Sequence, residues 1–145
     1  MAIKKILWPT DLSDNARLAL PLVASLSEKY GAEVHVLYVM EDLGFFGAWY
    51  GDFDRSHIEK MQEMDQQKAE ERLDEICQNH LEGCPLYIRH TAKGDPASEI
   101  LKLAEKENPD IVVMATKGAR GSFHFGSVAE KVIKNATVPV LTVPA

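Results

Sequence analysis

The sequence predicts a single α/β domain with a parallel β-sheet and helices on both faces of that sheet. Three observations lead to this prediction. Segments with strand-like and helix-like patterns alternate along the whole chain. The connections between successive strands are long enough for the helical crossovers that parallel strands require. Several strand segments are almost continuously apolar, which is typical of strands that are covered on both faces.

Length and composition fit one domain spanning residues 1–145. A content of 46% hydrophobic and 26% charged residues argues against wholesale disorder. The net charge of -6 disfavours nucleic-acid binding, which needs a basic surface. No apolar run reaches the roughly twenty residues of a membrane span, and Pro9 interrupts the N-terminal apolar segment before a secretory signal could form. We therefore expect a cytoplasmic protein that contacts neither nucleic acid nor a membrane.

The first part of the chain predicts a strand, a helix and a second strand. Residues 3–8 form a short apolar run that Pro9 is expected to end. The helix that follows has periodic apolar positions and finishes at Gly31, the type of residue that caps helix C-termini. Pro21 removes one backbone N–H from this helix, so we expect a bend there. The second strand, 34–39, is nearly all apolar and is expected to lie inside the sheet.

The segment 41–56 is rich in glycine, aromatic and acidic residues and is the least regular part of the chain. Its aromatic side chains either pack on the domain or a partner subunit, which we favour, or form a lid over a ligand. A long helix is expected over 57–81, with a polar face in solvent. Its apolar or small positions are Met61, Met64, Ala69, Leu73 and Ile76.

The second half continues the alternation of strands and helices. A third strand over 86–91 alternates polar with less polar residues, which indicates an edge strand with one wetter face. Asp95 is expected to be the N-cap, and Pro96 the first residue, of a helix that runs to about Glu107. The last helix is expected over 128–135 and the fifth strand over 138–143.

The segment 111–127 is the one on which the functional interpretation depends. The run 111–114 predicts a buried strand, and Gly118, Gly121 and Gly126 then allow the backbone to turn and to approach a ligand. Ser127 stands where the N-cap of the last helix is expected. Because a helix N-terminus presents unpaired N–H groups and the positive end of the helix dipole, this segment predicts a phosphate site.

Three loops are expected to meet around that site. They follow the carboxyl ends of the first, second and fourth strands, at residues 9–11, 39–40 and 115–127. In open parallel sheets, ligands bind beyond these strand ends, where neighbouring crossovers leave toward opposite faces. The three loops therefore predict one shared crevice.

The chain resembles the universal stress protein family over nearly its whole length. The resemblance is carried, in this order, by KKILWPTDLSDNARLAL, GAEVHVLYV, GDPASEILKLAEKENPDIVVMATKG and GSVAEKVIKNATVPVLTV. It implies an adenine nucleotide alpha hydrolase-like, Rossmann-like fold with a five-stranded parallel sheet of order 3-2-1-4-5. It also implies a homodimer that pairs through the last strand, which begins at Val138 and ends at Val143.

One branch of this family binds ATP through G-x-x-G, nine further residues and G-[ST]. The present chain has Ala115 in place of the first glycine, keeps Gly118, and has only seven residues, 119–125, before Gly126 and Ser127. The alanine adds one methyl group, whereas the shortening re-aims the loop that should surround the phosphates. The resemblance still implies ATP or another adenine nucleotide as ligand, alone or with Mg²⁺.

Specific roles can be assigned to the residues of this site. Asp11 would accept hydrogen bonds from adenine or ribose, or would cap the first helix. Val39 and Met114 would border the base, or are plain core, while Ser127 adds a hydroxyl to the phosphate site or only caps its helix. The expected nucleotide-binding residues are Pro9, Thr10, Asp11, Val39, Met114, Ala115, Gly118, Gly126, Ser127 and Val128. Candidate phosphate cations are Lys117, Arg120 and His124, none of them favoured individually.

The sequence gives little support for catalysis or for a protein metal site. The chain lacks the G-x-x-x-x-G-K-[ST] loop of rapid phosphoryl transfer, and Ser122 beside His124 has no identifiable orienting partner. The other histidines are scattered without metal-ligand spacing, and Cys77 and Cys84 are expected to be free thiols. Three hypotheses remain open: a nucleotide-binding stress-response module, a ligand-free interaction protein of the same family, and a slow ATPase.

Overall fold

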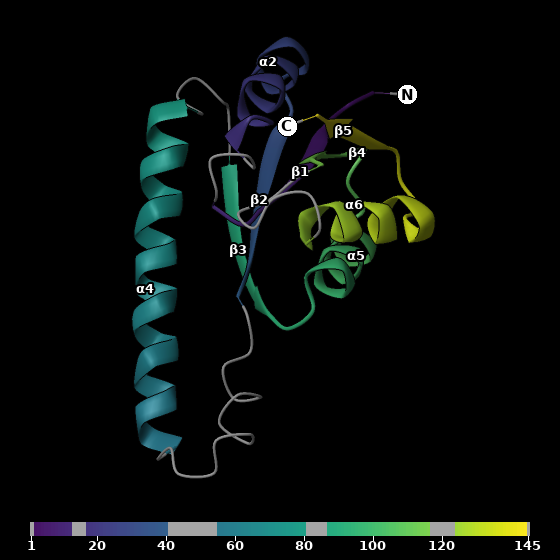
Figure 1. The fold of residues 1–145 in the computed structure, drawn as a ribbon. Coiled ribbons are helices and arrows are strands. Elements are labelled where there is room, and N and C mark those ends of the chain that lie inside the picture. The colour runs from purple at the N-terminus through teal and green to yellow at the C-terminus, as the bar shows by residue number, and fades with distance from the viewer. Residues whose placement is uncertain (1, 13–16, 41–54, 81–86, 117–123, 145) are drawn as a thin grey trace.

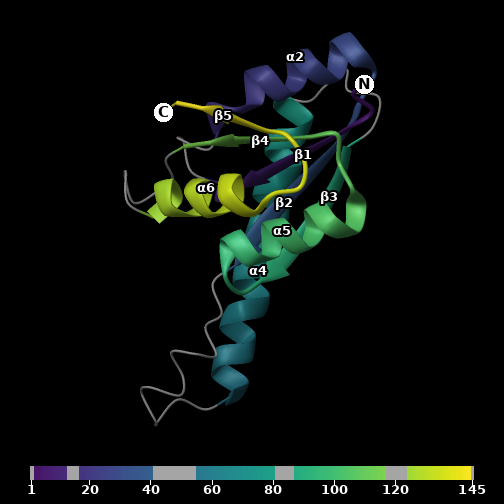
Figure 2. The same ribbon diagram turned by 90° about the vertical axis from the view of Figure 1, so that its right-hand side faces the viewer.

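The computed structural model describes residues 2–12, 17–40, 55–80, 87–116 and 124–144. Its five parallel strands lie in the order β3-β2-β1-β4-β5, as predicted, with helices packed on the two faces of the sheet (Figures 1 and 2). The strands are β1 (Lys5–Thr10), β2 (Glu33–Met40), β3 (Tyr87–Lys93), β4 (Ile111–Ala115) and β5 (Val140–Val143). The helices are α2 (Leu20–Tyr30), α4 (Arg55–His80), α5 (Pro96–Glu107) and α6 (His124–Asn135).

β1 lies at the centre of the sheet and does not end where the sequence predicted. Pro9 lies within the strand, in register with Leu37 of β2, and the strand continues to Thr10. A proline is tolerated here because β1 pairs with β4 only at Ile6 and Leu7, so the last residues of β1 have a single neighbouring strand. The extension carries β1 two residues further toward the expected ligand crevice.

The predicted bend at Pro21 is replaced by the start of a helix. Arg17 is helical, a turn follows, and α2 then begins at Leu20 with Pro21 in its first turn, where a missing N–H costs no intrahelical bond. The predicted C-terminal glycine is confirmed. Gly31 has a left-handed φ of 63°, which an L-residue rarely adopts.

β3 is the edge strand that the alternating pattern predicted. It pairs with β2 alone, and Arg89, Thr91 and Lys93 are exposed while the intervening residues are partly covered. On the other edge, β5 begins at Val140 rather than at the predicted Val138. The chain before it is already bound to β4, because the N–H of Val112 donates to the carbonyl of Pro139 at 2.9 Å.

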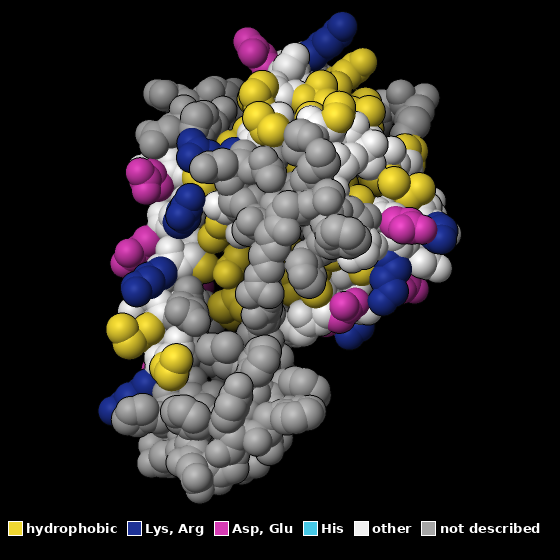
Figure 3. Space-filling model, in the orientation of Figure 1, with side chains coloured by type: hydrophobic (Ala, Val, Ile, Leu, Met, Phe, Trp, Pro, Cys, Tyr) yellow, Lys and Arg dark blue, Asp and Glu magenta, His cyan; other side chains and the backbone are white. Residues whose placement is uncertain are grey.

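α4 is longer than the sheet that it covers. Its second half packs Ala69, Leu73 and Ile76 into the core, as predicted. Its first half extends beyond the sheet in Figures 1 and 2, and Met61 and Met64 are 52% and 57% exposed. In Figure 3, acidic and basic side chains alternate along the upper part of this helix, and hydrophobic side chains project from it below them. Of the apolar or small positions listed from the sequence, Met61 and Met64 are thus exposed, because no part of the sheet lies beneath the first half of the helix (Figure 1).

The core is divided by the sheet into two clusters. One contains Trp8, Val34 and Val36 with residues of α2 and α4. The other contains Leu7 and Met114 with residues of α5 and α6. Alternate residues of β1 thus serve opposite faces, as expected for a sheet that is covered on both sides. Within the described residues, no helix combines the length and the apolar character that crossing a bilayer would require.

Candidate functional site

The strand order creates a topological switch between β1 and β4. These two strands are neighbours, but α2, which follows β1, packs on one face, whereas α6, which follows β4, packs on the other. A crevice forms at such a point because the two connections diverge from adjacent strand ends. The predicted residues Pro9 to Asp11 and Met114 to Ala115 lie at these two ends.

The turn after β1 is held in an unusual conformation. Thr10 is buried, and its hydroxyl accepts a hydrogen bond from the N–H of Leu12 at 3.0 Å. Leu12 has a φ of 65°, and its side chain packs into the core on the α2 face. Left-handed backbone at a residue other than glycine costs on the order of 1–3 kcal/mol and is retained only where the surroundings impose it. Asp11, which is half-buried, lies between these two residues directly after the strand end.

The end of β2 is tied to the edge strand. The carbonyl of Met40 accepts a hydrogen bond from the N–H of Gly94 at 3.1 Å. Val39 is half-buried and packs against the core cluster of α5 and α6. Its side chain therefore has the core role that the sequence left open, and its backbone lies one residue from the strand end.

The end of β4 is enclosed. The side chains of Met114 and Ala115 are 0% and 1% exposed, within the core cluster of α5 and α6. Directly after them, the N–H of Thr116 donates to the carbonyl of Val143 at 3.0 Å. Any ligand at this strand end would thus meet backbone groups rather than these two side chains. Gly118, Lys117, Arg120 and Ser122 lie outside the described residues.

Ser127 does not have the predicted position at the N-cap of the last helix. α6 begins at His124, so Ser127 lies in its first turn. The reason is that a glycine such as Gly126 costs a helix only about 1 kcal/mol, while the packing of Val128, Ala129 and Val132 on the core stabilises the whole helix. Since the first N–H groups of any helix have no partner within it, the backbone groups that the sequence analysis assigned to a phosphate would belong to residues about one turn before Ser127.

A hollow of about 330 Å³ lies between the start of α5 and the face of α6. Its lining includes the predicted residues Ser127 and Val128, beside Asp95 and Lys131. Lys131 Nζ lies 3.9 Å from Asp95, and Lys134 Nζ lies 2.9 Å from Glu130. The lysines of this hollow are thus balanced by carboxylates, so it offers an anion little net positive charge.

Asp95 is the N-cap of α5, as predicted. Its carboxylate accepts hydrogen bonds from the hydroxyl of Ser98 at 2.8 Å and from its N–H at 3.0 Å. These bonds hold the pKa of Asp95 below its usual value. The carboxylate therefore caps the N-terminus of α5, which starts beside Gly94 at the end of β3.

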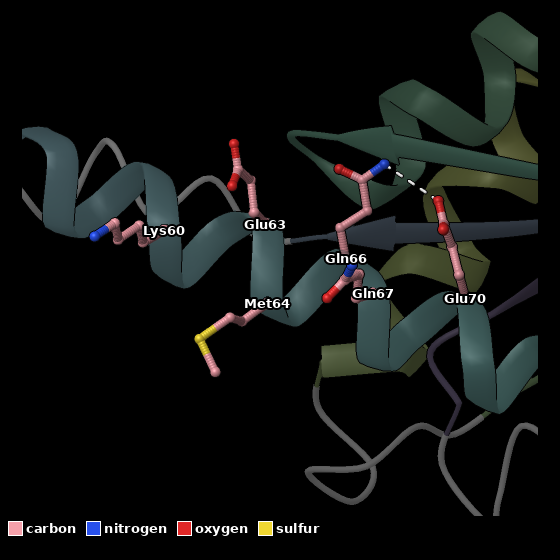
Figure 4. Close-up of a pocket in the computed structure, with 6 residues that line it drawn as sticks. All are labelled: Lys60, Glu63, Met64, Gln66, Gln67 and Glu70. Atoms are coloured by element: carbon pink, nitrogen blue, oxygen red, sulfur yellow. Dashed lines mark hydrogen bonds between the residues drawn. The ribbon is translucent and has the colours of Figure 1, made fainter.

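A larger hollow of about 470 Å³ lies along the exposed part of α4 (Figure 4). The described residues that line it all belong to this helix, among them Lys60, Glu63, Met64 and Gln67. In Figure 4 the side chains of Glu63 and Met64 point in different directions rather than toward a common centre. None of the described residues among the predicted site residues lines this hollow.

Two histidines that the sequence analysis treated as scattered are in contact. His35 Nδ1 lies 2.8 Å from His90 Nε2, and their rings are 5.1 Å apart between centroids. The predicted order of neighbouring strands could have revealed this pair, because β2 and β3 run side by side. Among the described residues, no group of three or more histidine, cysteine and acidic side chains is arranged to bind a metal ion.

Comparisons with known proteins agree with this architecture. The model of the universal stress protein family matches residues 2–144. The universal stress protein MJ0531 of Methanocaldococcus jannaschii is 34% identical, over 97% of this chain and 81% of its own length. The universal stress protein MJ0577 of the same organism is 30% identical, over 97% of this chain and 94% of its own length.

The solved structures show the same fold. The structure of MJ0577 superposes with a TM-score of 0.85 at 29% identity, covering 100% of this chain and 98% of that one. An Archaeoglobus fulgidus universal stress protein in complex with dAMP has a TM-score of 0.67 at 21% identity, covering 98% of both chains. An Arabidopsis thaliana family member with AMP bound has a TM-score of 0.68 at 18% identity, covering 97% of this chain and 91% of that one.

Proposed function

The chain belongs to the universal stress protein family, and from this premise we propose that it binds ATP or another adenine nucleotide where β1, β2, β4 and α6 meet. The observation that carries the proposal is the switch between β1 and β4, with a helix N-terminus following β4. The complexes of related folds with dAMP and AMP support the choice of an adenine nucleotide.

Each part of the crevice would make a different contact. The carboxylate of Asp11 would accept hydrogen bonds from the adenine amino group or a ribose hydroxyl, while Val39 would present its backbone to the base. Gly118, Gly126 and Ser127 would direct amides and a hydroxyl at the phosphates. Pro9, Thr10, Met114, Ala115 and Val128 would shape the crevice without charged contacts. Mg²⁺, if it accompanies the nucleotide, would be held mainly by phosphate oxygens and water.

We further propose that the protein acts in a stress response as a homodimer joined through β5. This strand lies at the edge of the sheet, Val140 is half-buried, and Leu141 is 36% exposed. Pairing with a second copy would satisfy the outer backbone groups of β5 and cover these side chains.

A second candidate function is that of an interaction protein without a nucleotide. It is supported by the shortened segment between Gly118 and Gly126 and by the complete burial of Met114 and Ala115, which leave little side-chain lining at the end of β4. In that case the domain would act only through its protein surfaces.

Mass spectrometry of the purified protein under native conditions separates the two functions. The proposal predicts a mass increase corresponding to an adenine nucleotide, either as purified or after addition of millimolar ATP. A spectrum without any adduct, under conditions in which a known nucleotide-binding control retains its ligand, would favour the interaction protein.

A further inference from the structure

A chain of three titratable side chains crosses from β2 to the edge strand β3. Glu33 and His35 both belong to β2, and Glu33 Oε1 lies 3.0 Å from His35 Nε2. His35 Nδ1 in turn lies 2.8 Å from Nε2 of His90 on β3. His35 is 3% exposed and both of its ring nitrogens are engaged, so few other groups can replace these partners.

The chemistry of the three groups fixes where their protons are. A carboxylate only accepts, so His35 Nε2 must carry a hydrogen toward Glu33. In a neutral imidazole the other nitrogen is then a bare acceptor, so the hydrogen between the two rings must belong to His90 Nε2. Both histidines are therefore Nε2–H tautomers when neutral, and further protons can bind only their Nδ1 atoms.

Charged groups of both signs surround these three side chains. Lys5 of β1 places its Nζ 3.8 Å from Glu33 Oε1 and 3.6 Å from Glu107 of α5. Lys106 of α5 and Lys5 disfavour a positive charge on His90, whereas Glu107 favours it. Burial, and after it the neighbouring His35, lower the pKa of His90 below its ordinary value.

We propose that Glu33, His35 and His90 form a hydrogen-bonded chain that fastens β3 to β2 while it holds at most one added proton, and that releases β3 when a second proton enters. The first added proton leaves the hydrogen bond between the two rings intact, because one ring still donates and the other still accepts. A second added proton makes the facing nitrogens of both rings donors and sets two positive rings against each other.

The direction of the pH effect follows from the lowered pKa of His90. The unfolded protein binds a proton at His90 more readily than the folded protein does. The contribution of His90 to stability is therefore complete above the unfolded pKa of 6.5 and decreases as the pH falls toward the folded pKa. β3 has no second neighbour among the strands, so loosening its contact with β2 frees one whole edge of the sheet. The domain thus carries an acid-sensitive edge, at the side of the sheet opposite β5.

Nitrogen-15 NMR of the imidazole rings in the full-length protein tests the proton positions. At about pH 8, where histidine is neutral, both His35 and His90 are expected to show a protonated Nε2 and a bare Nδ1. On acidification, the pair should take up its first proton with the hydrogen between the two rings retained. A protonated Nδ1 on neutral His35, or independent titration of the two rings, would overturn the proposal.

Hydrogen exchange tests the effect on the strand. Protection factors of β3 amides, divided by those of β1, are expected to fall about tenfold or more between about pH 7 and about pH 5. H90Q should abolish this fall, because glutamine can still donate to His35 but does not titrate. H80Q removes a histidine from α4 and should leave the fall unchanged. An equal fall in the wild type and in H90Q would contradict the proposal. Should H90Q fail to fold, the double variant H35L/H90L replaces the whole pair with apolar side chains and carries the same expectation.

Discussion

The hydroxyl of Thr10 accepts a hydrogen bond from the backbone N–H of Leu12 at 3.0 Å, across a turn in which Leu12 itself is left-handed, with a φ of 65°. This bond links the last residue of the central strand to the first residues of its crossover. Asp11 lies between the two bonded residues, so the position of its carboxylate depends on the bond. The strained turn is thus the structural element that connects the fold to the proposed nucleotide site.

Two substitutions of Thr10 should separate the contribution of its hydrogen bond to stability from the contribution of its side-chain volume. T10V keeps the shape but leaves the N–H of Leu12 without its acceptor, so the free energy of unfolding should fall by about 1–3 kcal/mol. T10S keeps the acceptor and should stay within about 1 kcal/mol of the wild type. Urea denaturation measures both values. Equal stability of T10V and T10S would show that the bond does not hold the turn.

Two glycines with positive φ should differ in their tolerance of alanine. At Gly94, φ is 137° and an added Cβ would lie 3.3 Å from Glu99 Oε1, so G94A should destabilise the protein by about 1–3 kcal/mol. At Gly31, φ is 63° and an added Cβ would meet no atom within 4 Å, so G31A should cost about 1–2 kcal/mol from the backbone alone. Thermal unfolding of the two variants gives the comparison. A G94A protein as stable as the wild type would contradict the positive φ of Gly94 and its close approach to Glu99.

Asp95, the N-cap of α5, should make the stability of the protein depend on pH under acidic conditions. D95A removes the cap and should cost about 1 kcal/mol at neutral pH, whereas D95N still caps and should cost much less. The pKa of Asp95 is lowered in the folded protein, so its contribution is present above the unfolded pKa of 3.8 and is lost as the pH falls through the folded value. Denaturation at a series of pH values should therefore show a shallower acid loss for D95N than for the wild type. Parallel curves would mean that Asp95 is not linked to folding.

The two halves of α4 should respond differently to truncation of their apolar side chains. Leu73 is fully buried, and L73A should cost about 2–5 kcal/mol. Met64 is 57% exposed, and M64A should change the free energy of unfolding by no more than about 0.5 kcal/mol. Denaturant unfolding of the two variants and of the wild type gives both values. A large loss in M64A would show that the first half of the helix is packed against something.

Much of the fold could be predicted because its local signals agree with its tertiary structure. Asp95 and Pro96 mark the start of α5 with cap chemistry that no other element contradicts. Gly31 marks the end of α2 in the same way. The order of the strands followed from the family resemblance, since neither hydrophobic periodicity nor turn residues specify which strands are neighbours.

The remaining features depended on contacts that no local pattern contains. Pro9 was expected to end β1, but whether a proline is tolerated in a strand depends on which neighbour needs its N–H. Ser127 was a good cap residue, yet packing of α6 on the core extends the helix past it. The pairing of His35 with His90 required the register of two strands, and the left-handed Leu12 had no sequence signal at all.

The most direct test of the nucleotide site is equilibrium binding of labelled ATP to three proteins. The wild type should bind saturably. G126D should fold, because an acid in the first turn of α6 favours the helix, but should lose at least about tenfold in affinity, because the carboxylate takes the place of a phosphate at the N–H groups. K134Q, in the last turn of the same helix, should bind like the wild type. If G126D binds ATP as tightly as the wild type, or if the folded wild type does not bind at all, the nucleotide does not lie at the start of α6.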